Sequence, residues 1–217
     1  MRSSFESAVM LLVTGVTNLC MVPAIVNLHR QEYVFEEFIG SFTMVTSFMY
    51  HCCDSIDGPL WLTEGQWHRL DNIGSIMSFI IWAIHLMDLP DARLERYLHY
   101  GFLALVLVFQ ERNPWDEVNS YAPILLCFAV LAGSIVVRRR VPRYDLGQVA
   151  RGLFLLGCGV CCFVRGLDDD NDPFRIFHGC WHAFIGASAY HNFRVLPSRR
   201  QRQHGAHLPL RKFRSDD

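Results

Sequence analysis

Seven apolar stretches, each about long enough to cross a lipid bilayer, follow one another along the 217-residue chain. A transmembrane helix needs about 20 mostly apolar residues, because each residue advances about 1.5 Å along the helix axis. We therefore expect an all-α fold, a seven-transmembrane helix bundle that occupies residues 1–195. The predicted spans cover residues 7–28, 34–53, 71–89, 94–110, 121–138, 147–167 and 174–194.

The charged residues between these stretches alternate in sign. The connections after spans one, three and five, together with the carboxyl-terminal tail, hold 14 of the 20 basic residues, whereas the other connections are acidic. The positive-inside rule then places the amino terminus on the exoplasmic side and the carboxyl terminus in the cytosol. Residues 196–217 are too polar to join a core, so we expect a basic, disordered cytosolic tail.

Composition agrees with a membrane protein and argues against nucleic acid as a partner. Charged residues make up 19% of the chain, compared with about 25% in an average soluble domain. The net charge of −1 offers no excess of positive charge to a polyanion. We expect an integral, multi-pass protein of the plasma membrane or of an endomembrane such as the ER or Golgi. The redox state of Cys52 and Cys53, at the end of the second span, stays open.

Three histidines from two predicted spans could meet at the exoplasmic end of the bundle. His178 and His182 are four residues apart and so share one helical face, and His51 lies near the outer end of the second span. A single histidine in a bundle is more often a packed core residue. Three at the same predicted end match the three-histidine ligand set of a catalytic zinc site, whose fourth position is open to water.

Two further polar residues fall at the same predicted end. Asp71 begins the third span and Ser47 lies one turn before His51. An aspartate there could orient a water molecule or take its proton. A serine could hydrogen-bond that water or a developing oxyanion. We therefore predict Asp71 and Ser47 as catalytic residues and His51, His178 and His182 as Zn2+ ligands.

Other potential ligands have more ordinary interpretations. Cys158, Cys161 and Cys162 lie beside glycines in the sixth span, which favours close helix packing over metal binding. His85 and His99 fall toward the predicted cytosolic ends of their spans, where we expect packing or interfacial roles.

The chain resembles the CREST superfamily of seven-span metal-dependent hydrolases. The resemblance rests on Ser47-x-x-x-His51, on Asp71 and on His178-x-x-x-His182, and it extends over about residues 40–197. It implies a seven-helix bundle that binds zinc through His51, His178 and His182, with Ser47 and Asp71 beside the metal. Characterised members include a ceramide amidase and a phospholipase, so the reaction class implied is hydrolysis of a lipid amide or ester.

Two functions remain open from the sequence. The first is a zinc-dependent intramembrane hydrolase that cleaves an amide or ester bond of a membrane lipid. The second follows from the closer resemblance to the myomaker-related transmembrane branch: a non-enzymatic protein with a structural zinc, acting in membrane organisation or cell fusion. Helix faces with small residues would also allow close packing between two copies of the chain, so a homo-oligomer is a further possibility.

Overall fold

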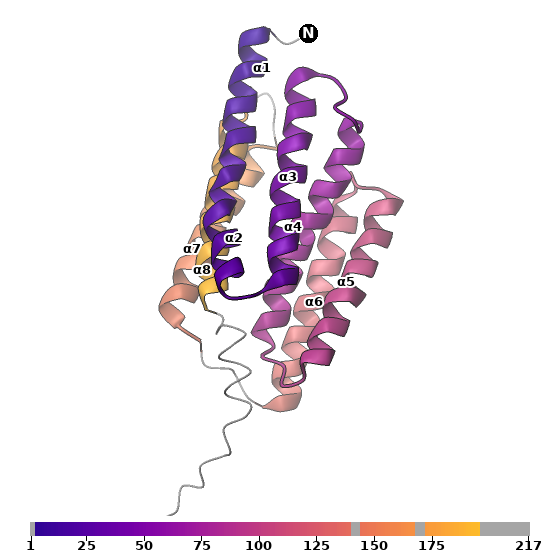
Figure 1. The fold of residues 1–217 in the computed structure, drawn as a ribbon, viewed down its shortest axis with the longest axis vertical. Coiled ribbons are helices and arrows are strands. Elements are labelled where there is room, and N and C mark those ends of the chain that lie inside the picture. The colour runs from indigo at the N-terminus through magenta and orange to yellow at the C-terminus, as the bar shows by residue number, and fades with distance from the viewer. Residues whose placement is uncertain (1–2, 140–143, 168–171, 196–217) are drawn as a thin grey trace, which may run out of the picture.

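The computed structural model describes residues 3–139, 144–167 and 172–195, and these residues form a bundle of seven helical rods without a β-strand (Figure 1). The all-α prediction is therefore confirmed, and each rod corresponds to one predicted span. The predicted tail at 196–217 lies outside the described residues. The rods are the N-terminal segment Ser4–Arg30, then α3 (Val34–Ile56), α4 (Glu64–Leu86), α5 (Ala92–Arg112), α6 (Glu117–Arg138), α7 (Leu146–Arg165) and α8 (Ile176–Arg194).

The N-terminal segment is a helix with two irregular turns. It consists of α1 (Ser4–Met10), a π-helical turn (Leu11–Gly15), a 3-10 turn (Asn18–Met21) and α2 (Val22–Arg30). The 3-10 turn begins at Asn18, whose side-chain amide donates 2.9 Å to the carbonyl oxygen of Thr14. Irregular turns free main-chain carbonyls from the regular helical pattern and often accompany functional sites.

The third rod begins earlier than the hydrophobic pattern indicates. We predicted its span from residue 71, but α4 begins at Glu64, because Thr63 and Gln66 form a capping box. The extra turns carry Trp67 among the polar residues Glu64, Gln66, His68 and Arg69, which hide them from a search for apolar spans. The helix also ends at Leu86 rather than at residue 89.

The bundle has two halves that α3 joins. In one half α4 packs against α5 and α6, and a row of buried isoleucines on α4 forms much of the core. In the other half α8 lies between α7 and the N-terminal segment, and α3 contacts both α4 and the N-terminal segment (Figure 1). Side chains from α3 can therefore meet α8 at one place and α4 at another.

Glycines allow two of these helix pairs to come close. A Cβ atom at Gly152 would lie 1.9 Å from Asn192 of α8, and one at Gly74 would lie 2.9 Å from the Cα atom of Thr43 on α3. Gly157 of α7, by contrast, would place its Cβ atom in open space. The predicted small-residue packing in α7 therefore holds for the face toward α8 only.

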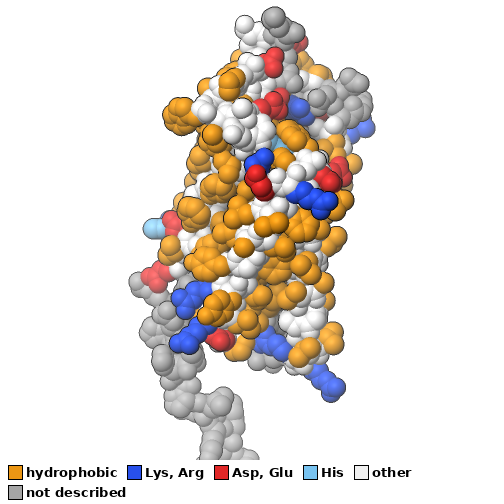
Figure 2. All heavy atoms as spheres, turned by 90° about the vertical axis from the view of Figure 1, so that its right-hand side faces the viewer, with side chains coloured by type: hydrophobic (Ala, Val, Ile, Leu, Met, Phe, Trp, Pro, Cys, Tyr) orange, Lys and Arg blue, Asp and Glu red, His pale blue; other side chains and the backbone are white. Residues whose placement is uncertain are grey.

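The outer surface is suited to lipid. Figure 2 shows a broad band of hydrophobic side chains on one face, with charged side chains in its upper half and others near its lower end. Within the described residues, three rods are long and apolar enough to cross a membrane: Ser4–Arg30, Glu117–Arg138 and Leu146–Arg165. Exposed apolar residues on α5, α6 and α7 include Val108, Leu125, Val136, Val137, Phe154 and Val164.

Candidate metal centre

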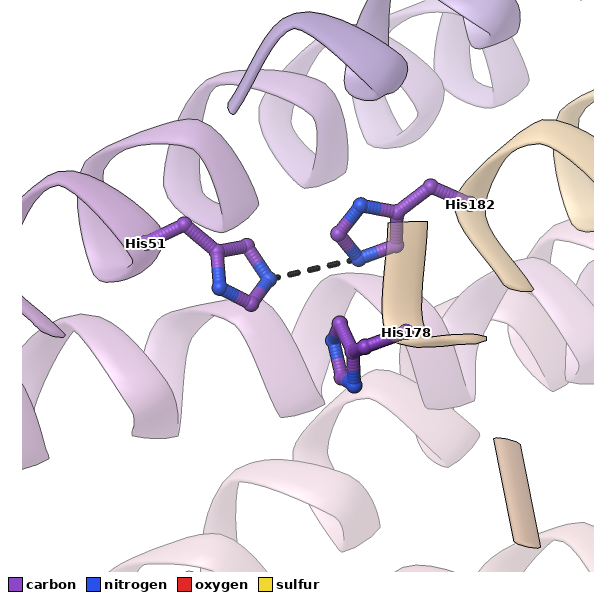
Figure 3. A group of neighbouring side chains, drawn as sticks. All are labelled: His51, His178 and His182. Atoms are coloured by element: carbon purple, nitrogen blue, oxygen red, sulfur yellow. Dashed lines mark hydrogen bonds between the residues drawn. The ribbon is translucent and has the colours of Figure 1, made fainter. Parts of the chain in front are cut away.

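The structure brings His51 of α3 together with His178 and His182 of α8 (Figure 3). One nitrogen from each imidazole lies within 4.8 Å of a nitrogen from each of the others. His51 and His182 are buried and His178 is half-buried. As their four-residue spacing on α8 predicts, His178 and His182 extend from the same helical face, which is turned toward His51 of α3.

The rings are arranged as the ligands of one small ion would be. Each pair of ring centroids is 4.8 Å apart, with interplanar angles of 58° to 82°. The Nε2 atoms of His51 and His182 face each other at 3.2 Å. Tetrahedral zinc with Zn–N bonds of about 2.0–2.1 Å would separate its ligand nitrogens by about 3.3 Å, so this pair already has the required spacing.

The N-terminal segment orients His182. Nδ1 of this ring lies 3.0 Å from the carbonyl oxygen of Thr14 and 3.2 Å from the hydroxyl oxygen of Thr17. A carbonyl oxygen can only accept, so Nδ1 carries the proton and Nε2 presents a lone pair toward His51. Metal-bound histidines commonly donate their second ring N–H to a carbonyl in this way. The donor set therefore fits a zinc ion.

Two glycines of α8 make this contact between helices attainable. A Cβ atom at Gly179 would lie 2.7 Å from the carbonyl oxygen of Val13, and one at Gly186 would lie 2.6 Å from that of Cys20. Both atoms belong to the backbone, so they cannot move aside as a flexible side chain can. The seven-residue spacing places both glycines on the side of α8 that faces the N-terminal segment.

The start of α8 is fixed by an aspartate and an arginine. The buried Asp172 accepts a hydrogen bond of 3.2 Å from the backbone N–H of His178. Arg175, which precedes the helix, has a left-handed backbone (φ 56°) and its guanidinium lies 3.8 Å from the carboxylate of Asp54 on α3. These contacts tie the beginning of α8 to the end of α3, where His51 lies.

Asp71 and Ser47 contact each other near the same end of the bundle. Asp71 of α4 accepts a hydrogen bond of 3.4 Å from Ser75, and Ser47 of α3 is a further hydrogen-bond partner. Ser47 is buried one turn before His51. Asp71 does not belong to the group of potential ligands within 4.8 Å of one another. The structure therefore links the predicted catalytic pair to each other across α3 and α4.

Aromatic residues line the same end of the bundle. The ring of Tyr50 lies 4.8 Å from that of His51 and 5.0 Å from that of His68. His68 in turn stacks on Trp115 with 3.8 Å between centroids and 8° between planes. Trp115 is 57% exposed, so this stack forms an apolar rim between the centre and the outside.

Sequence analysis did not identify Thr14, Thr17, Asp172 or Arg175 as part of this site. The signal that was present is the polar group Thr14, Thr17 and Asn18, spaced as one face of a helix inside an otherwise apolar run. Polar residues on a membrane helix usually face another helix, so the face with Thr14, Thr17 and Asn18 could have been predicted to contact one. The spacing does not show which helix that is.

A family model described as "Protein of unknown function (DUF3522)" matches residues 6–183, which include all five predicted site residues. The chain belongs to the DUF3522 family. Transmembrane protein 8B from Homo sapiens is 28% identical over 207 residues, which cover 89% of this chain and 42% of that protein. The Bos taurus protein of that name is 26% identical over 188 residues, covering 82% and 39% respectively.

This DUF3522 chain spans about two fifths of the length of the curated relatives it matches. Those relatives are transmembrane proteins by name, and the helices described above have the apolar surface of a membrane protein. The protein is therefore a membrane protein.

Proposed function

We propose that this chain is a multi-pass membrane hydrolase that uses zinc to cleave an amide or ester bond of a lipid. The observation that carries the proposal is the pair of Nε2 atoms on His51 and His182, 3.2 Å apart, with the proton of His182 held on Nδ1 by Thr14. Nδ1 of His51 is buried without a hydrogen-bond partner within the described residues, so Nε2 of His51 can either donate to Nε2 of His182 or hold a cation together with it. His178 completes a set of three nitrogen ligands with a fourth position open.

When bound there, zinc would lower the pKa of a water ligand to about 7 and polarise a carbonyl oxygen. The three imidazoles would hold the ion near the end of the bundle that Tyr50, His68 and Trp115 border. We assign Asp71 the role of the base that would accept the proton of the attacking water. Ser47 and Ser75 donate hydrogen bonds to Asp71 and so keep its oxygens in place.

The surroundings favour a lipid as substrate. The centre lies in a bundle that exposes many hydrophobic side chains, the surface expected of a protein surrounded by acyl chains (Figure 2). The resemblance to the CREST superfamily, and within it to the myomaker-related branch, supplies the reaction class. Amide and ester bonds of lipids are the bonds that such a centre would cleave.

The test is metal content and lipid turnover of the purified full-length chain in detergent micelles, with ceramides and phospholipids as substrates. His182→Ala should lose zinc and turnover together. Asp71→Asn should keep zinc and lose turnover by about 100-fold or more, as expected for a general base. The matched control is His191→Ala, which removes an imidazole from the far end of α8, where it contacts Gln148.

Two results would contradict this assignment. Full turnover by Asp71→Asn would remove the proposed base. Zinc that stabilises the chain without any lipid hydrolysis would favour a structural zinc, which the geometry also suits, because His51, His182 and Thr14 join three segments of the chain. That outcome would support the non-enzymatic function in membrane organisation or cell fusion.

The orientation in the membrane is also a proposal. The basic residues Arg93, Arg96, Arg138 and Arg139 lie near the end of the bundle opposite to the three histidines. By the positive-inside rule this end faces the cytosol, and the metal centre lies toward the exoplasmic side.

A further inference from the structure

A second cluster of potential metal ligands lies at the other end of the bundle. It consists of Glu36 near the start of α3, His85 near the end of α4 and His99 on α5. One ligand atom from each lies within 4.8 Å of the others. Glu36 and His51 are 15 residues apart on the same helix, which corresponds to about 22 Å at 1.5 Å per residue. The cluster is therefore separate from the three-histidine centre.

His85 is the middle of this cluster. Its Nε2 atom lies 2.8 Å from a carboxylate oxygen of Glu36, and its Nδ1 atom lies 3.7 Å from a carboxylate oxygen of Glu95. The ring of His99 lies 5.5 Å away at 65° to that of His85. Nδ1 of His85 is fully buried and makes no hydrogen bond within the part of the chain that the structure describes. One imidazole thus stands between two carboxylates.

The cluster is closed to solvent. Glu36, His85 and His99 are 2%, 1% and 2% exposed, and Glu95 is 8% exposed. Tyr33 places its ring 5.1 Å from His85 at a steep angle, and Phe35 stacks on His99 at 5.1 Å. Aromatic walls of this kind lower the local dielectric, which strengthens any interaction between the enclosed charges.

The two carboxylates of this cluster favour the binding of a cation. Glu36 and Glu95 place two carboxylates together inside a membrane bundle, where an isolated ionised group is costly and is normally paired or bound to a metal. With both carboxylates ionised and both imidazoles neutral, as metal binding requires, these four side chains would carry a formal charge of −2. One divalent cation compensates this charge, and it does so with ligands that are already in place.

We propose that Glu36, His85 and His99 bind a divalent transition-metal cation. Two imidazoles and a carboxylate are ligands that suit Zn2+, Fe2+ and related ions, whereas Ca2+ and Mg2+ prefer oxygen ligands throughout. Nε2 of His85 faces Glu36 and is the nitrogen that binds the ion. The carboxylate of Glu95, 3.7 Å from Nδ1 of His85, would become the acceptor for Nδ1–H once the ion is bound, as carboxylates orient metal-bound histidines.

The experiment uses Zn2+ as the probe and counts zinc ions per chain after chelation and reloading of the full-length protein in detergent. The unaltered chain should bind two equivalents. His85→Ala and Glu36→Gln should each bind one, retained at the three-histidine centre. His182→Ala should also bind one, and the combined His85→Ala, His182→Ala chain should bind none. His191→Ala is the matched control and should bind two.

The His182→Ala chain separates this proposal from the proposed function, because its second cluster is intact. Its thermal midpoint should rise on addition of Zn2+, and Glu36→Gln in the same background should abolish the rise. If His182→Ala binds no zinc, or if His85→Ala and Glu36→Gln leave the stoichiometry at two, the second site does not exist. Loss of lipid turnover alone would neither support nor contradict the second metal site. Retention of one equivalent by His85→Ala would also show that the chain is folded.

Discussion

At the scale of single residues, the contacts of one imidazole decide what the centre can do. His182 has a ring nitrogen committed to the backbone of Thr14, and this commitment directs its other nitrogen toward His51. The spacing of His178 and His182 was sufficient to predict that they share a face. The tautomer could not be predicted, because the acceptor lies 168 residues away and on another helix.

The hydroxyl of Thr17 shares the Nδ1–H of His182 with Thr14, at 3.2 Å. Thr17→Val keeps the shape of the side chain and removes this acceptor. Because outer-shell partners typically contribute 10- to 100-fold to metal affinity, and because the Thr14 carbonyl remains, we expect a loss of about 10-fold. A competition assay with a zinc chelator measures it.

Thr46→Val is the matched control for Thr17→Val. The hydroxyl of Thr46 bonds to the carbonyl of Phe42 within α3, at 2.9 Å, and is not a partner of the histidines. Equal zinc affinities for both variants would show that the Thr17 hydroxyl does not orient His182.

At the scale of the helices, the sequence predicted which segments are helical. It was less successful in predicting where each helix begins and which other helices it packs against. Each predicted apolar run corresponds to one of the seven rods, and three of these rods, within the described residues, are long and apolar enough to cross a bilayer. The start of α4 was misplaced by seven residues, since its first two turns lie outside the apolar run and depend on capping by Thr63. His85 and His99 were both predicted toward the cytosolic ends of their spans, but their convergence with Glu36 depends on helix rotation.

Because α8 packs closely on the N-terminal segment, alanine at Gly179 should lower the stability of the protein far more than alanine at Gly157. Gly179→Ala would place a Cβ atom 2.7 Å from the carbonyl oxygen of Val13, so one helix must move. Overpacking of this kind costs about 1–3 kcal/mol. We expect a lower free energy of unfolding, measured in mixed micelles, and weaker zinc binding, because His182 moves away from Thr14.

Gly157→Ala is the control, because its Cβ atom would meet nothing within 4 Å. Alanine is the better helix former by about 1 kcal/mol, so this variant should be unchanged or slightly more stable. A Gly179→Ala chain as stable as Gly157→Ala would mean that the two helices are not in such close contact.

At the scale of the whole molecule, α3 connects two clusters of polar groups at opposite ends of one apolar bundle. His51 belongs to one and Glu36 to the other, and both are buried. Such polar clusters are costly in a membrane and are retained where they have a function. The family assignment agrees with a membrane protein. The two ends of the bundle differ in their ligands: three histidines lie at one end, and a glutamate with two histidines lies at the other.

The distribution of charge predicts which end faces the cytosol. An epitope inserted after Gly58, in the connection between α3 and α4, should be labelled on the exoplasmic side of sealed membranes. An epitope inserted after Leu89, in the next connection, should be labelled only after the membrane is made permeable, since arginines flank it. The opposite pattern of labelling would reverse the proposed orientation and place the three histidines toward the cytosol.

The acceptor that orients His182 is a main-chain oxygen of Thr14. An exchange of the side chain at position 14 leaves that oxygen where it is, so alanine scanning would pass over one of the groups nearest to the centre. The position of this acceptor is set by the irregular path of the backbone between Leu11 and Met21 and not by the chemical identity of the side chain at position 14. A replacement of that amide by an ester, which weakens the carbonyl as an acceptor, would expose it.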